Sequence, residues 1–165
     1  MLNAVSLARL QDLHPLLSAK IRQLDSILDA EKIAVQVIQG TRSWSAQSIL
    51  YAQGRTTPGP IVTNAPPGHS WHQFGLAADL CPAVAYGPAG AFVPDWNASH
   101  PAWAVMIAKG EALGLYSGSE FCSIKDMPHF QLTGRFPVSP DGEVRQLFLD
   151  GGTQAVWEES GLPTS

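Results

Sequence analysis

Prolines and glycines interrupt this chain so often that only short regular elements fit between them. The 165 residues include 15 glycines and 13 prolines, and many of these lie in two stretches, 54–68 and 82–99. Proline and glycine at this density indicate turns and loops rather than the interiors of helices or strands. The chain is therefore expected to fold as a loop-rich domain with short helices and strands.

The residue patterns between the loops predict both kinds of element. Apolar side chains at helical spacing predict a helix over 16–30, and similar arguments predict helices over 45–53 and 101–113 and a tail helix that starts at Ser139-Pro140 and ends at Gly151. Apolar or alternating runs predict strands over 33–38, 75–81 and 129–132. Because strands do not alternate regularly with long helices, the pattern favours an α+β fold with an antiparallel sheet over a doubly wound parallel fold.

Composition excludes several classes of protein. The formal net charge is −4, so no basic excess indicates nucleic acid as a partner. No apolar run approaches the length of a membrane span, and the N-terminal residues lack the pattern of a secretory signal. The two cysteines, Cys81 and Cys122, are too few for a disulfide scaffold and are expected to be free thiols.

Two short segments, 70–79 and 126–130, concentrate side chains that bind metals. Zinc accepts imidazole nitrogen and carboxylate oxygen, and His72, Asp79 and His129 would supply two nitrogens and one oxygen. Asp79 lies in an otherwise apolar strand, where a carboxylate is costly unless it is paired or metal-bound. The spacing alone leaves open that both histidines are ordinary hydrogen-bonded residues.

Asp126 has the position of a general base rather than a ligand. It lies three residues before His129, but Pro128 prevents the two from sharing a helix. A turn that leads into a strand would hold Asp126 near the metal without binding it. A base in that position can take a proton from a zinc-bound water.

The two segments, written Ser-x-His-x-x-Gly-x-Ala-x-Asp and Asp-x-Pro-His-Phe, resemble the VanY-type zinc peptidases of peptidoglycan. This family includes D-alanyl-D-alanine carboxypeptidases and the L-alanyl-D-glutamate endopeptidases found among phage endolysins. The resemblance runs from about residue 10 to residue 132. It includes further matches in the same order at residues 13–15, 40–43, 50–51, 54–55 and 62–68.

The resemblance implies a fold and a set of site residues. The implied fold is a small antiparallel sheet with flanking helices, like that of the Hedgehog domain and D-Ala-D-Ala peptidases. His72, Asp79 and His129 match the zinc ligands, and Asp126 matches the catalytic acid/base. Arg42 matches the arginine that faces the substrate carbonyl, although a structural ion pair is its alternative. Gln47 and Ser70 match positions near the cleft, where a helix cap or a turn residue is the alternative role.

The chain is expected to be one peptidase domain over residues 1–165, with its catalytic core at about 10–132. The extension at 133–165 has one predicted helix and is too short for an independent wall-binding module, so we expect it to pack on the core. Two departures affect the shape of the cleft. Thr41 replaces a tyrosine that is common in the family, and residues 115–121 lack the Trp-Gly-Gly of endolysin-type members.

The expected activity is zinc-dependent cleavage of the L-Ala–D-Glu bond in peptidoglycan stem peptides. Asp126 at the base position and the His14-Pro15 pair favour the endopeptidase branch, with a D,D-carboxypeptidase as the alternative. A non-catalytic zinc-bearing binding module is the alternative from another class, and the presence of Asp126 argues against it. We expect a monomer without nucleic-acid or membrane partners. It would be made in the cytoplasm and act on the wall after release, as with phage or prophage enzymes.

Overall fold

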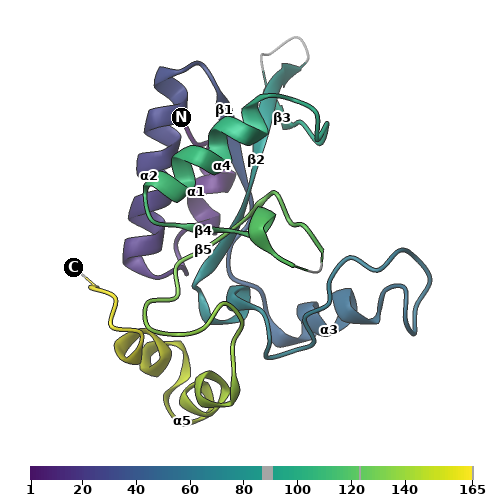
Figure 1. The fold of residues 1–165 in the computed structure, drawn as a ribbon, viewed down its shortest axis with the longest axis vertical. Helices are drawn as coiled ribbons and strands as arrows, with labels where there is room; N and C mark the ends of the chain where they lie inside the picture. The colour runs from purple at the N-terminus through teal and green to yellow at the C-terminus, as the bar shows by residue number, and fades with distance from the viewer. Residues whose placement is uncertain (87–90, 123, 165) are drawn as a thin grey trace.

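The structure is a computed structural model, and it describes residues 1–86, 91–122 and 124–164. Five antiparallel strands form one sheet in the described residues: β1 (Ala34–Gln39), β2 (Ala77–Tyr86), β3 (Ala91–Pro94), β4 (Tyr116–Ser117) and β5 (His129–Gln131). The sheet order is β1-β2-β5-β4, and β3 pairs with β2 as a hairpin. Figure 1 shows helices flanking this sheet, which confirms the expected α+β architecture.

The main core lies between the sheet and two helices, α2 (Pro15–Ala30) and α4 (Ala102–Ala112). The apolar stripe of α2 is fully buried at Leu17, Ile21, Leu24 and Leu28, as its helical spacing predicts. Trp103 and Met106 of α4 pack into the same cluster. The short helix α1 (Ala4–Arg9), which the sequence patterns did not predict, contacts β1 and is capped by Asn3.

The strand β2 is the centre of the sheet because it pairs with β1, β3 and β5. It continues to Tyr86 and pairs with β3, so the loop predicted over 82–99 was wrong at residues 82–86 and 91–94, whereas residues 95–99 lie outside helices and strands as predicted. Pro82 lies opposite Val35 in the register with β1, and its carbonyl still accepts a hydrogen bond from the Asp95 amide at 2.7 Å. Residues 87–90 of the predicted loop lie outside the described residues.

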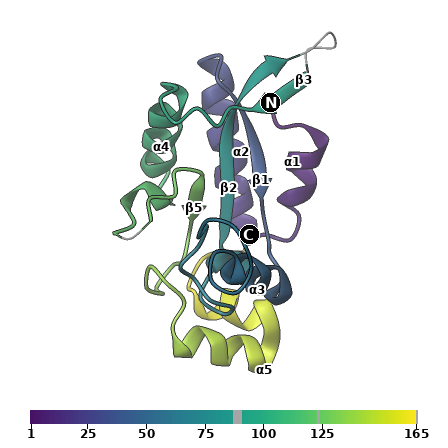
Figure 2. The same cartoon turned by 90° about the vertical axis from the view of Figure 1, so that its right-hand side faces the viewer.

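The helices α3 (Trp44–Ala52) and α5 (Gly142–Glu159) lie at the end of the sheet where β2 begins (Figure 1 and Figure 2). Asp141 caps α5, in place of the predicted Ser139. The helical dihedral angles break at Gly151 and Gly152, so the predicted stop is a kink after which helix continues. No helix among the described residues has both the length and the apolar character needed to cross a membrane.

A second apolar cluster joins the residues after 132 to the short 3₁₀ helix η1 (Trp71–Phe74). It is formed by buried side chains of η1, of residues 76 and 77 around the start of β2, and of the residues after 132: Trp71, Phe74, Leu76, Ala77, Phe136, Val144 and Val156. The Trp157 indole also donates a hydrogen bond to the Phe74 carbonyl at 2.8 Å. The first metal-binding segment therefore rests on side chains of α5 and of the segment before it.

His14 connects the start of α2 to this second cluster. Its Nδ1 accepts a hydrogen bond from the Leu16 amide at 3.2 Å, and its ring lies 5.1 Å from that of Trp157. The side chain is completely buried, and burial lowers the pKa of His14 below its ordinary value of 6.5.

We expect the free energy of unfolding to fall as the pH drops below about 6.5, because there the unfolded chain binds a proton that folded His14 does not. Urea unfolding between pH 7.5 and 5, with EDTA present, measures this slope. His14→Asn keeps a capping acceptor but has no titrating ring, so its slope should be shallower. Equal slopes in the two proteins would contradict this role for His14.

Candidate metal centre

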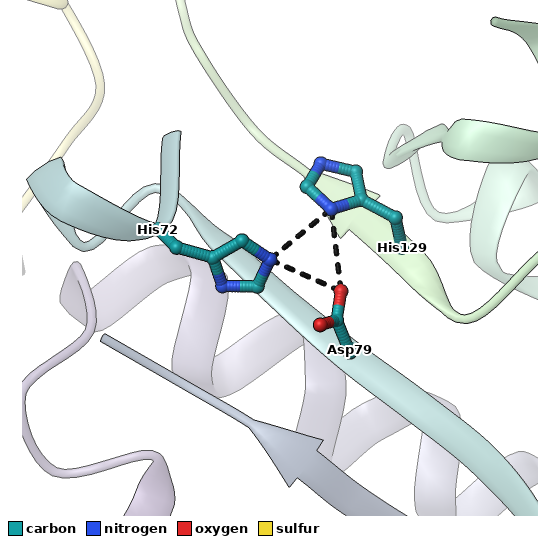
Figure 3. A group of neighbouring side chains, drawn as sticks. All are labelled: His72, Asp79 and His129. Atoms are coloured by element: carbon teal, nitrogen blue, oxygen red, sulfur yellow. Dashed lines mark hydrogen bonds and ion pairs between the residues drawn. The ribbon is translucent and has the colours of Figure 1, made fainter. Parts of the chain in front are cut away.

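Three side chains from separate elements point toward one another where β2 pairs with β5. His72 comes from η1, Asp79 from β2 and His129 from the first position of β5. Asp79 and His129 are direct partners in the β2–β5 register, so their side chains lie on one face of the sheet. Figure 3 shows the two imidazole rings and the carboxylate converging, as the spacing of the two sequence segments predicts.

The distances within this cluster fit a zinc ion. His72 Nε2 lies 3.0 Å from Asp79 Oδ1 and 3.2 Å from His129 Nδ1, and His129 Nδ1 lies 3.3 Å from Asp79 Oδ1. A tetrahedral zinc with bonds of about 2.0–2.1 Å holds its ligand atoms about 3.3 Å apart. The three donor atoms therefore already have the separations of three corners of a zinc tetrahedron.

In each histidine, the ring nitrogen that faces away from the cluster forms a hydrogen bond with an acceptor. His72 Nδ1 donates to the carbonyl of Gly40 at 2.8 Å, and His129 Nε2 donates to the amide oxygen of Gln131 at 3.0 Å. Each neutral ring then has its unprotonated nitrogen directed at Asp79. Two nitrogen lone pairs and a carboxylate oxygen that face one another form a donor set for a metal ion, and the hydrogen bonds behind them are typical of metal-binding histidines.

The same contacts shift the pKa values of Asp79 and His129. Burial alone would raise the pKa of Asp79, but the charges of His72 and His129 and their contacts outweigh it, and the pKa lies far below its usual range. Burial would lower the pKa of His129, but its contact with Asp79 outweighs this and raises it. The contacts of Asp79 with the two imidazole rings therefore keep its carboxylate ionised although it is buried.

Asp126 lies beside the three-residue cluster and not within it. It occupies the turn that leads into β5, where its carbonyl accepts a hydrogen bond from the His129 amide at 3.1 Å. Burial raises the pKa of Asp126, and the negative charge of Asp79 raises it further. A carboxyl group with a raised pKa next to a metal centre has the proton affinity that a general base needs.

Gly118 holds this turn in place by close packing. A Cβ atom at position 118 would lie 2.5 Å from the Asp126 carbonyl oxygen and 2.8 Å from His129 Cβ. The Gly118 carbonyl accepts a hydrogen bond from the Asp126 amide at 3.0 Å. The segment that departs from the family pattern therefore lies directly against the second metal-binding segment.

Arg42 forms an ion pair with Asp79. Its Nη2 is 3.5 Å from Asp79 Oδ2, and its Nη1 donates a hydrogen bond to Gln47 Oε1 at 3.0 Å. Gln47 is fully buried and donates to the Ala65 carbonyl at 2.8 Å, so both ends of its amide are used within the chain. Ser70 precedes η1, and its side chain does not cap that helix.

The sequence patterns did not single out Gln131 or the carbonyl of Gly40. The strand predicted at 129–132 could have indicated that Gln131 lies beside His129, because residues two apart on a strand share a face. No residue pattern marks a main-chain carbonyl such as that of Gly40. Cys81 and Cys122 are both free, the first buried and the second exposed.

Comparisons with known proteins connect this geometry to one family. Two family models, both described as D-alanyl-D-alanine carboxypeptidase, match residues 10–91 and 63–132. The chain is 30% identical over 128 residues to the peptidoglycan L-alanyl-D-glutamate endopeptidase CwlK of Bacillus subtilis (strain 168), which covers 73% of this chain and 74% of the relative.

Solved structures share the fold. The L-Ala D-Glu endopeptidase ChiX of Serratia marcescens aligns with a TM-score of 0.55 and 24% identity, covering 81% of this chain and 90% of ChiX. The vancomycin-resistance D,D-pentapeptidase VanY, in complex with Zn(II), aligns with a TM-score of 0.50 and 16% identity, covering 87% of this chain and 80% of VanY. These similarities agree with the observed sheet and its flanking helices.

Proposed function

Because the chain belongs to the VanY family of D-alanyl-D-alanine carboxypeptidases, which are peptidoglycan peptidases, we propose that it is a zinc-dependent endopeptidase that cuts the L-Ala–D-Glu bond of stem peptides. The observation that carries the proposal is the His72, Asp79 and His129 cluster with Asp126 beside it. The choice of bond is supported by the aspartate at position 126 and by the 30% identity to a relative named for that bond.

His72, Asp79 and His129 would hold the zinc ion through the three atoms that already face one another. When bound, zinc supplies a Lewis acid that polarises a carbonyl and lowers the pKa of a coordinated water to about 7. Asp126 accepts the proton of the attacking water and passes it to the amine that leaves. Its partly buried carboxyl is close enough to the cluster for the charges of His72 and His129 to act on it.

Arg42 binds the substrate carbonyl and stabilises the negative charge that develops on its oxygen. Its guanidinium is held on two sides, by Asp79 and by Gln47, so it is oriented before the substrate arrives. Gln47 contributes to substrate binding by holding Arg42 in place. We assign Ser70 to the rim of the same cleft, since it adjoins the segment that carries His72.

We further propose that residues 1–165 act as a monomeric peptidase domain with its catalytic core at about 10–132. Residues 133–165 contribute Phe136, Val144 and Val156 to the second apolar cluster, which also contains Trp71 and Phe74 of η1. The partner is the stem peptide of peptidoglycan. An enzyme made in the cytoplasm would reach this substrate after release of the cell contents.

Digestion of purified muropeptides followed by mass spectrometry tests the proposed bond. The expected products are a disaccharide that keeps L-Ala and a free peptide that begins with D-Glu. Loss of a terminal D-Ala alone would instead support the D,D-carboxypeptidase that the family description names. A protein that binds zinc and releases no product would support the non-catalytic binding module.

A further inference from the structure

One main-chain carbonyl, that of Val138, binds a side chain of the first metal-binding segment and a side chain directly after the second. It accepts a hydrogen bond from Gln131 Nε2 at 2.8 Å and another from the Trp71 indole at 2.9 Å. Trp71 is the neighbour of the ligand His72, and Gln131 contacts the ligand His129. Val138 lies beyond residue 132, the last residue that either family model matches.

The carbonyl of Val138 determines which way the Gln131 amide points. An amide group has a donor end and an acceptor end, whereas a carbonyl oxygen only accepts. The NH₂ group of Gln131 therefore faces Val138, and its oxygen faces His129 at 3.0 Å. Gln131 is only 2% exposed, so bulk water does not compete for either end.

The orientation of Gln131 in turn determines the proton position on His129. A neutral imidazole carries one proton, and the Gln131 oxygen requires it on Nε2. His129 Nδ1 then keeps the lone pair that faces His72 and Asp79. The reversed amide would put two oxygens in contact at Val138 and would favour the other tautomer, whose Nδ1 cannot bind a metal.

We propose that the Val138 carbonyl, through Gln131, holds His129 in the tautomer that binds metal, which makes Gln131 a positioning residue and residues 133–138 part of the metal centre. This inference rests on the proposed zinc site. The segment is itself well held, since the Phe136 ring packs 5.8 Å from that of Trp71 and Thr133 donates to the Phe136 carbonyl at 3.1 Å.

The first test is the zinc affinity of Gln131 variants, measured by competition with a chromogenic chelator. Gln131→Leu keeps the volume but removes both hydrogen bonds, and we expect its zinc affinity to fall about 10–100-fold. Gln131→Glu still accepts the His129 proton but places a second oxygen against the Val138 carbonyl, so its loss of zinc affinity should be smaller than that of Gln131→Leu. Gln154→Leu is the matched control, because Gln154 is exposed in α5, where its amide donates a hydrogen bond to Glu158 at 2.8 Å.

The second test needs no substitution. Nitrogen-15 spectra of histidine-labelled, metal-free wild-type protein at pH 8 distinguish the two tautomers, and we expect His129 with its proton on Nε2. A proton on Nδ1, or a Gln131→Leu variant that binds zinc as tightly as wild type, would overturn this inference. Wild-type protein that binds no zinc would overturn the proposed function as well, so the two failures are distinguishable.

Discussion

Asp126→Asn is expected to lower turnover of muropeptides about 10²–10⁴-fold, the usual contribution of a general base, while zinc content stays at one ion per chain. The amide has the shape of the carboxylate but cannot accept the proton of the attacking water. Asp126 stands outside the three-residue ligand cluster, so the metal should remain bound. Steady-state cleavage assays and metal analysis of the dialysed protein measure the two effects separately.

Asp150→Asn is a suitable control for this substitution. Asp150 is exposed on α5 and accepts a hydrogen bond from Gln146, so its loss should change neither turnover nor zinc content. If Asp126→Asn instead lost its zinc, Asp126 would be a ligand and the assignment of the base would be wrong.

His129→Ala should abolish both zinc binding and activity. The variant removes one of three donors and leaves Asp79 facing a single imidazole, which is too few ligands for a stable site. Wild-type protein should gain about 2.7 kcal/mol of stability at a zinc concentration 100-fold above its dissociation constant, and the variant should gain little. Metal analysis after dialysis and thermal unfolding with and without zinc provide the measurements.

His100→Ala provides the matched comparison for the loss of a histidine. His100 accepts a hydrogen bond from the Ala102 amide at the start of α4 and is not part of the metal-binding cluster. Its zinc content should equal that of the wild type. Full zinc occupancy in His129→Ala would refute the ligand set.

The ligand cluster was predictable because zinc chemistry depends on side-chain identity. His72, Asp79 and His129 are the residue types that zinc accepts, and the apolar run around Asp79 indicated a buried carboxylate. The groups that orient the ligands were not predictable in the same way. Two of them are the main-chain carbonyls of Gly40 and Val138, and a carbonyl is present at every position of the sequence.

The fold was predicted best where one face of an element is buried. The apolar stripe of α2 marked that helix within a few residues of its observed bounds. The β2–β3 hairpin was missed because Pro82 and Pro94 suggested a loop, whereas pairing between distant strands determined the outcome. The kink in α5 reflects a similar competition, since packing of Val156 keeps helix going after Gly151 and Gly152.

The pairing of Asp79 with His129 across β2 and β5 makes metal binding depend on strand alignment. A slip of one residue would turn His129 to the opposite face and set Phe130 against the carboxylate. The strand β5 has only three residues, so its own ladder bonds discriminate weakly between alignments. The Leu80 amide, which donates to the Pro128 carbonyl at 2.8 Å, adds one further constraint. A metal ion bound by Asp79 and His129 would therefore favour the native alignment of the two strands. Part of its binding free energy would stabilise the native strand pairing relative to shifted pairings.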